Sequence, residues 1–154
     1  VEATAQVNDI RKRAMGRKVI QAMGGDVRGK VVALLGLTFK PNTDDMRDAP
    51  SLSIIRALED GGARVCAYDP EGQEQARPLL PDVTFAESPY AAAQGADALV
   101  IVTAWDEFRA LDLKRMAGLL RQPILVDLRN VYPPEEAARA GLAYVGVGRG
   151  VPAA

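Results

Sequence analysis

The sequence predicts an α/β fold, a Rossmann-like three-layer sandwich built on a mainly parallel sheet of about six strands. Short, wholly apolar runs such as 31–35 and 98–102 are long enough for strands that are buried on both faces. Stretches with a helical spacing of apolar residues separate these runs, and glycines and prolines mark the boundaries. Strands that alternate with helices in this way favour a parallel sheet covered by helices on both sides.

Residues 1–28 are expected to form the tail of a helix and a short connection. The apolar residues recur every three or four positions and share one helix face: Ala3, Val7, Ile10 and Ala14. The paired Gly24 and Gly25 should end this helix. The basic cluster at 11–18 could serve a nucleic acid. A solvated helix face is the better interpretation, because the cluster contains no aromatic residue.

Residues 29–150 are expected to form one domain of alternating strands and helices. Strands are predicted at 31–35, 64–68, 83–85, 98–102, 124–127 and 142–145. Helices are predicted at 50–60, 71–80, 88–94, 106–120 and 134–140. Ser88 is a good N-cap for the third of these helices, with Pro89 at its first position.

The composition limits the classes of function. A chain of 154 residues, 48 % apolar and 25 % charged, is typical of one globular domain. A net charge of −1 and the lack of a transmembrane-length apolar run predict no nucleic-acid partner, no membrane and a cytoplasmic protein. One cysteine and no histidine exclude Cys/His zinc sites and histidine-dependent triads. Cys66, within a predicted strand, should be buried and inert.

The beginning of the chain suggests a piece of a longer protein. It opens on Val1 without an initiator methionine, inside a predicted helix. A processed or tagged chain is the alternative.

Three loops at one edge of the predicted sheet are the candidate functional segments. The loops are 36–50, 103–106 and 128–133, and each follows a predicted strand. They are candidates because ligands of parallel sheets bind beyond the carboxyl ends of the strands. The first reads GLTFKPNTDDMRDAPS, which is neither the glycine fingerprint of a dinucleotide site nor a phosphate-binding P-loop. This loop therefore argues against NAD binding in the usual crevice of this domain.

Cations in these loops could bind a phosphate group. Lys40 and Arg47 lie in the first loop, and Arg129 follows the fifth predicted strand. The alternative for Arg47 is a salt-bridge lattice within the loop, with Asp44, Asp45 or Asp48. The alternative for Arg129 is a tie to Asp127 or a free surface position. The residues alone leave these interpretations open.

Three further polar or aromatic residues follow predicted strands. An acid at the position of Asp69 binds the ribose in a true dinucleotide domain. Without the glycine fingerprint, a turn or a helix cap is the better interpretation of Asp69. Trp105 and Tyr132 could pack over the loops or line a ligand cleft, and packing is favoured for Trp105.

Four segments together resemble a known enzyme family. GKVVALLGLTFKPNTDDMRDAPS at 29–51, YDP at 68–70, ADALVIVTAWDEF at 96–108 and ILVDLRNVY at 124–132 look like the C-terminal domain of UDP-glucose 6-dehydrogenases, in the UDP-glucose/GDP-mannose dehydrogenase family. The opening VEATAQVNDIRKR is similar to the end of the long helix that joins the central and C-terminal domains of that family.

The resemblance implies a function for the whole enzyme. Members of the family oxidise UDP-glucose to UDP-glucuronate with two NAD, a step of polysaccharide biosynthesis. A separate N-terminal domain binds NAD, and a cysteine in a glycine-rich segment forms a thioester. Neither segment occurs in these 154 residues, and Cys66 has a different context. The chain is therefore expected to hold no catalytic residue and no metal, and to act with the rest of its polypeptide in a homodimer or larger homo-oligomer.

The resemblance also implies roles for four residues. Phe39 and Lys40 would contact the UDP-sugar, and Arg47 would reach NAD held by the other nucleotide domain. Arg129 would contact the sugar nucleotide, in the site of a neighbouring subunit. The alternatives are a related GDP-mannose or UDP-N-acetylhexosamine dehydrogenase and a stand-alone nucleotide-binding module.

Overall fold

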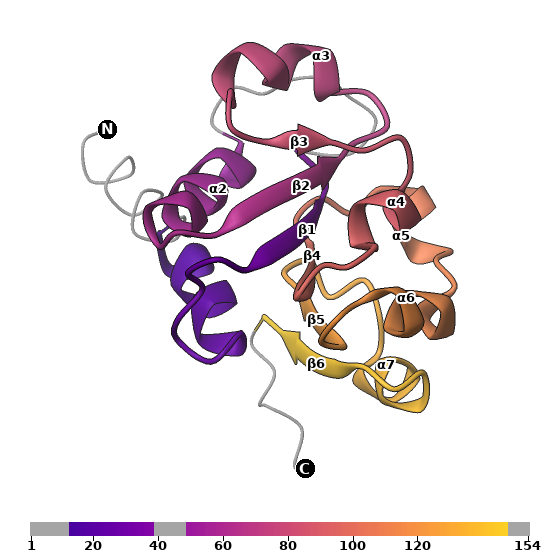
Figure 1. The fold of residues 1–154 in the computed structure, drawn as a ribbon. Coiled ribbons are helices and arrows are strands. Elements are labelled where there is room, and N and C mark those ends of the chain that lie inside the picture. Colours follow the sequence, from indigo (N-terminus) through magenta and orange to yellow (C-terminus); the bar gives the residue numbers. More distant parts are fainter. Residues whose placement is uncertain (1–12, 39–48, 148–154) are drawn as a thin grey trace, which may run out of the picture.

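Six parallel strands form one sheet in the order β3-β2-β1-β4-β5-β6 (Figure 1). The strands are β1 (Val31–Leu35), β2 (Arg64–Tyr68), β3 (Thr84–Phe85), β4 (Ala98–Ile101), β5 (Ile124–Asp127) and β6 (Ala143–Gly146). The strand order reverses between β1 and β4, which lie side by side in the middle of the sheet. The predicted fold class and number of strands are therefore confirmed. The computed structural model describes residues 13–38 and 49–147.

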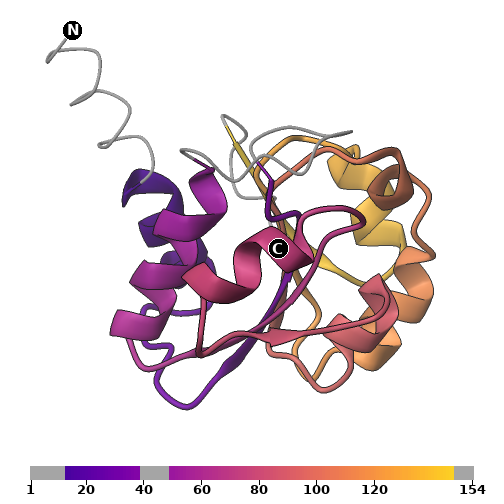
Figure 2. The ribbon, with the colours of Figure 1, turned by 90° about the horizontal axis from the view of Figure 1, so that it is seen from above.

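Two layers of helices cover the two faces of the sheet (Figure 2). The helix at 13–22 and α2 (Pro50–Asp60) lie on one face, where α3 (Gln73–Ala76) also contributes Ala76 to the core. The helices of the other face are α4 (Pro89–Ala93), α5 (Asp106–Arg109), α6 (Leu113–Leu119) and α7 (Pro134–Arg139). The three-layer arrangement is the one that the alternating pattern predicts.

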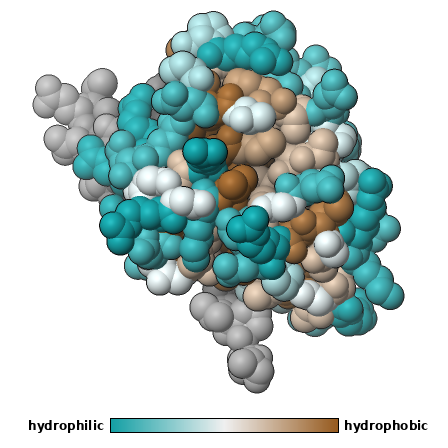
Figure 3. Space-filling view, in the orientation of Figure 1, coloured by the Kyte–Doolittle hydropathy of each residue, from teal (hydrophilic) through white to brown (hydrophobic). Residues whose placement is uncertain are grey.

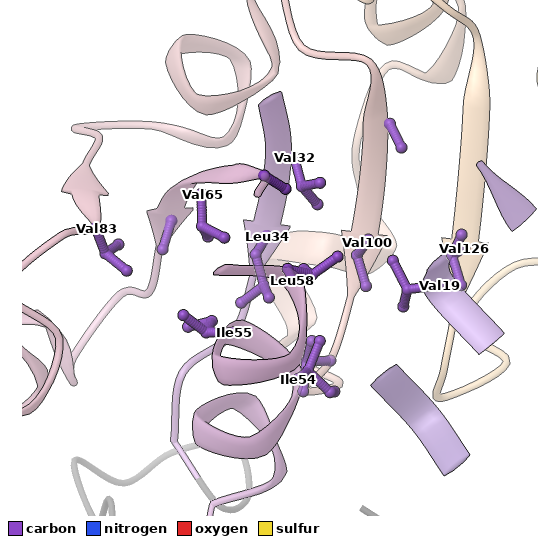
Figure 4. Packing of buried hydrophobic residues seen from close by; sticks show 14 of the residues in the cluster. Val19, Val32, Leu34, Ile54, Ile55, Leu58, Val65, Val83, Val100 and Val126 are labelled. Carbon is purple, nitrogen blue, oxygen red and sulfur yellow. The ribbon is translucent and has the colours of Figure 1, made fainter. Parts of the chain in front are cut away.

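Strand residues alternate between two hydrophobic cores. Val32 and Leu34 of β1 belong to the core under α2, whereas Ala33 and Leu35 belong to the core under α4–α7. In the first core, α2 directs Ile54 and Leu58 toward the strands (Figure 4). A strand whose side chains are buried in both directions must be apolar throughout, which explains the continuous apolar run of β1.

The helix at 13–22 packs closely against α2. A Cβ added at Gly16 would lie 2.9 Å from the Cβ of Ala57, so the two helices approach at a residue without a side chain. Val19 and Met23 are buried in the core under α2. The helix ends before Gly24 and Gly25, as predicted. The proposed division of the chain at residue 28 stays a prediction.

Two predicted helices are interrupted. The segment 106–120 was expected to be mostly helical, but it forms α5 and α6 with a break at 110–112. At this break the Asp112 carboxylate caps α6 by accepting a hydrogen bond from the Arg115 N–H, at 3.1 Å. The segment 71–80 contains the short α3 and a 3₁₀-helix (Arg77–Leu79), because Pro78 has no N–H for a continuous helix.

The remaining helix boundaries agree with the sequence pattern. The Ser88 hydroxyl accepts a hydrogen bond from the Ala91 N–H at 3.0 Å, and Pro89 opens α4, so the predicted cap is confirmed. The observed β3 and β4 differ from the predictions by one residue at one end, and β6 is shifted by one residue at both ends.

The surface is mainly polar, with apolar areas between the hydrophilic side chains of the face seen in Figure 3. Among the described residues, the exposed large apolar side chains are Leu79 and Val147. None of the helices described in 13–38 and 49–147 has the length and apolar character needed to cross a membrane.

Replacing Gly36 by alanine should destabilise the fold more than the same change at Gly141. Both glycines have a positive φ, of 98° and 93°, so each alanine carries a penalty of roughly 1–2 kcal/mol. A Cβ at Gly36 would also lie 2.6 Å from the Thr103 backbone nitrogen, whereas a Cβ at Gly141 would meet no atom within 4 Å. We expect Gly36→Ala to lower the free energy of unfolding by at least about 1 kcal/mol more than Gly141→Ala. Urea unfolding measures both; equal losses would contradict the close contact.

Candidate functional site

The loops after β1, β4 and β5 begin side by side at the carboxyl edge of the sheet. Three backbone hydrogen bonds continue the parallel pairing just past the strands: Gly36 N–H to Tyr68 O at 2.9 Å, Val102 N–H to Leu35 O at 2.8 Å, and Leu128 N–H to Ile101 O at 3.0 Å. The predicted grouping of the three loops at one edge is therefore confirmed.

Asp69 fixes the beginning of the first loop. Its carboxylate is almost fully buried and accepts hydrogen bonds from the backbone N–H groups of Leu37, at 2.7 Å, and Thr38, at 3.2 Å. The second oxygen accepts from the N–H groups of Glu71, at 2.9 Å, and Gly72, at 2.7 Å. These bonds confirm Asp69 as a turn residue. Its oxygens serve the backbone, and the N-cap of α3 is Gly72.

Two hydroxyl groups complete this anchor. Ser51 in the first turn of α2 donates a hydrogen bond to the Leu37 carbonyl at 2.6 Å, and Thr103 after β4 donates to the Thr38 carbonyl at 2.8 Å. Thr38, Ser51 and Thr103 are all buried. The part of the first loop that the structure describes is therefore tied to β2, to α2 and to the loop after β4.

The predicted ligand contacts Phe39, Lys40 and Arg47 lie outside the described residues. The neighbouring Thr38 and Ala49 are both buried at the carboxyl edge. Thr38 lies three residues after the end of β1, and Ala49 is the N-cap of α2. The roles of Phe39, Lys40 and Arg47 stay predictions.

Asp127 fixes the loop that contains Arg129. This fully buried carboxylate accepts hydrogen bonds from the backbone N–H groups of Arg129, at 3.3 Å, Val131, at 3.0 Å, and Tyr132, at 2.9 Å. The Tyr144 hydroxyl donates a fourth bond at 3.0 Å. Of the alternatives for Arg129, the tie to Asp127 is met only by a bond to the Arg129 backbone. The Arg129 side chain is exposed, and no described carboxylate forms an ion pair with it.

Asn130 is a structural residue that the sequence analysis did not single out. It has a φ of 51°, and it is the one described residue other than glycine with a positive φ. Its side-chain amide donates a hydrogen bond to the Val147 carbonyl at 3.0 Å and accepts one from the Val147 N–H at 3.1 Å. Asparagine tolerates this conformation better than most residues, which is the signal that could have identified it.

Trp105 and Tyr132 pack beneath the loops. Both are buried in the core under α4–α7, which confirms packing for Trp105 and decides it for Tyr132. The Tyr132 hydroxyl donates a hydrogen bond to the Phe108 carbonyl and accepts one from the Leu111 N–H at 2.9 Å. The Trp105 indole N–H is buried without a hydrogen-bond partner among the described residues.

A tyrosine–glutamate pair connects the end of β2 with α5, and the sequence analysis also missed it. The Tyr68 hydroxyl lies 2.9 Å from each carboxylate oxygen of Glu107. Partial burial, together with the negative charge of Glu107, raises the pKa of Tyr68 to about 12. The pair is exposed, so it is a surface connection between α5 and the end of β2.

Cys66 is half-buried in β2, so the expectation of full burial is wrong. Burial still raises the pKa of its thiol, which lowers the population of the reactive thiolate. Among the described residues, no cluster of three or more Asp, Glu, Cys or His side chains could hold a metal ion.

The architecture defines a Rossmann-like domain, whose strand order reverses between β1 and β4. In open α/β sheets this switch point is where ligands usually bind. The model of the UDP-glucose/GDP-mannose dehydrogenase family, UDP binding domain, matches residues 33–134. The chain therefore belongs to this family.

Relatives and solved structures agree with the family. The chain is 59 % identical over 149 residues to the UDP-glucose 6-dehydrogenase of Rhizobium meliloti (strain 1021), covering 97 % of this chain and 34 % of that protein. A UDP-glucose dehydrogenase structure from Pyrobaculum islandicum superposes with a TM-score of 0.75 at 35 % identity, over 95 % of this chain and 31 % of that one. A structure of a UDP-D-ManNAc dehydrogenase from Pyrococcus horikoshii also superposes with a TM-score of 0.75, at 26 % identity. This match covers 94 % of this chain and 32 % of that one. The chain spans about a third of the length of these relatives.

The stability of the chain should fall with rising pH between about 10 and 12, partly through Tyr132. Burial raises the pKa of Tyr132 from 10.0 to about 12, so the folded state holds this proton more tightly than the unfolded state. The resulting stabilisation is complete below pH 10 and is lost as pH rises to 12. In Tyr132→Phe the loss of unfolding free energy between pH 9 and pH 12 should be smaller by roughly 1–2 kcal/mol. Urea unfolding at several pH values measures this, and an identical pH dependence in both proteins would contradict it.

Proposed function

We propose that this chain is the nucleotide-sugar-binding domain of an NAD-dependent UDP-glucose 6-dehydrogenase. One observation carries the proposal: Arg129, exposed and without a described ion-pair partner, lies on an internally fixed loop at the edge where the first loop also begins. The identity of 59 % to a UDP-glucose 6-dehydrogenase over nearly the whole chain supports the choice of enzyme.

The chemistry of this edge suits the diphosphate of UDP. The guanidinium of Arg129 can bind phosphate oxygens with two parallel hydrogen bonds. We propose that Lys40 adds a second positive charge and that Phe39 contacts the nucleotide sugar, as the resemblance implies. Asp69 and Asp127 do not present their carboxylates to a ligand at the surface, because both are buried and accept hydrogen bonds from the backbone.

The residues of this domain do not fit NAD in its own crevice. The first loop lacks the glycines that let a pyrophosphate approach a helix N-terminus. The acid at the end of β2, Asp69, is buried and occupied by backbone donors. NAD is therefore proposed to bind mainly to another domain of the full-length enzyme, with Arg47 reaching toward it.

In the whole enzyme, this domain binds and orients the substrate, and its closure over the nucleotide excludes water from the reaction. Hydride transfer and the covalent step are assigned to segments outside these 154 residues. NADH formation from UDP-glucose by the chain alone would contradict this division. We further propose a cytoplasmic homo-oligomer in polysaccharide biosynthesis, in which Arg129 serves the site of a neighbouring subunit and there meets the Phe39 and Lys40 of that neighbour at one diphosphate.

Related dehydrogenases are the second candidate. The structural similarity to a UDP-D-ManNAc dehydrogenase shows that the same domain occurs in an enzyme for an N-acetylated sugar. Arg129 is proposed to bind the diphosphate, which these substrates share, so it does not select the sugar. Activity of the full-length protein toward UDP-glucose, UDP-N-acetylhexosamines and GDP-mannose would decide among them.

Removing the Arg129 side chain should weaken UDP binding by roughly tenfold or more, because a hydrogen bond to a charged group contributes about 1.5–3 kcal/mol. Isothermal titration of the chain with UDP, at two chain concentrations, measures the affinity and reveals any contribution from a second copy.

Arg139→Ala is the matched control. Arg139 is also an exposed arginine, but it lies at the end of α7, just before β6 begins at the opposite edge of the sheet. It should leave the affinity unchanged. Equal affinity of the wild-type chain and Arg129→Ala would contradict the proposed site.

A further inference from the structure

We propose that Asn130 is a positioning residue for Arg129, with Asp127 fixing the other side of the same loop. The inference rests on the proposed binding of a nucleoside diphosphate by Arg129. In this proposal Asn130 and Asp127 hold the backbone of Arg129 in place without contacting the ligand themselves.

The bonds of Asp127 restrict the loop from the side of the sheet. The carboxylate gathers the N–H groups of Arg129, Val131 and Tyr132 around one buried point at the end of β5. The Asp127 side chain is fully buried and also accepts the Tyr144 hydroxyl from β6. The backbone of Arg129 is therefore attached to the core, while its side chain remains exposed.

The bonds of Asn130 restrict the loop from the side of β6. Its side-chain amide bonds both the N–H and the C=O of Val147, as the backbone of an adjacent strand would. Gly146 allows this approach, because a Cβ there would lie 2.9 Å from the Asn130 Oδ1. The bond pair joins the Arg129 loop to the residue that follows the last strand of the sheet.

The left-handed backbone of Asn130 reverses the chain directly after Arg129. A φ of 51° is costly for most residues, and the two bonds to Val147 stabilise it. With Asp127 on one side and Asn130 on the other, the backbone of Arg129 is held in place before any ligand arrives. A ligand then does not have to order this loop, and its affinity rises accordingly.

The test is a double-mutant cycle on UDP affinity, with wild type, Asn130→Ala, Arg129→Ala and the double variant. Asn130→Ala should weaken UDP binding about tenfold, the size expected when binding must order the backbone of roughly one residue. In the Arg129→Ala background the same change should have almost no effect, because the residue that it positions is gone.

Amide hydrogen exchange gives a readout that needs no ligand. In Asn130→Ala the N–H groups of Arg129 and Val131 should exchange faster, while those of β1 and β4 stay as protected as in the wild type. Asn130 is exposed, so this variant should fold. Asp127→Asn, which is buried, should show the same coupling to Arg129 together with lower stability.

The outcomes separate the two proposals. If Asn130→Ala weakens UDP binding by the same factor with and without Arg129, or leaves the exchange of Arg129 unchanged, the positioning role is overturned while the proposed function stands. If Arg129→Ala alone binds UDP like the wild type, the proposed site is wrong and the inference is lost with it.

Discussion

Backbone N–H groups bonded to two buried carboxylates hold the carboxyl edge of the sheet together. Asp69 directly follows β2 on one side of the sheet centre, and Asp127 is the last residue of β5 on the other side. Each accepts hydrogen bonds from at least three N–H groups of irregular chain. Charged acceptors form strong hydrogen bonds, and loop donors without such partners would be costly to bury. The loops at this edge can therefore be irregular and still well defined.

The orientation of these two acidic residues bears on the proposed binding of a diphosphate at this edge. The carboxylates of Asp69 and Asp127 face inward and serve the backbone, whereas those of Asp106 and Glu107, just after β4, are exposed. The exposed charged side chain of the third loop is the positive Arg129. In a dinucleotide site the glycine loop supplies the phosphate contacts, whereas in this family member cationic side chains are proposed to do so. One strand order can thus support two ways of binding a nucleotide.

Much of the fold could be predicted from the sequence. Strands such as β1 and β4 are buried on both faces, so their residues are apolar throughout and stand out from the helical spacing of the segments between them. The break between α5 and α6 could not, since it coincides with a bond from Leu111 to Tyr132, 21 residues away. At the site, Asp69 was identified as a turn residue from its Asp-Pro pair. The role of Asn130 could not be predicted from the sequence, because it depends on Val147, which only the folded sheet brings near.

The most direct test of this account is amide NMR of the isotope-labelled chain during titration with UDP. If UDP binds at the carboxyl edge, the largest chemical-shift changes fall on the amides of residues 36–38, 103–105 and 128–132, and these changes saturate together. Binding at this edge would be contradicted if the strongest changes fell on the groove at the opposite edge, which Glu59, Arg64 and Asp82 line.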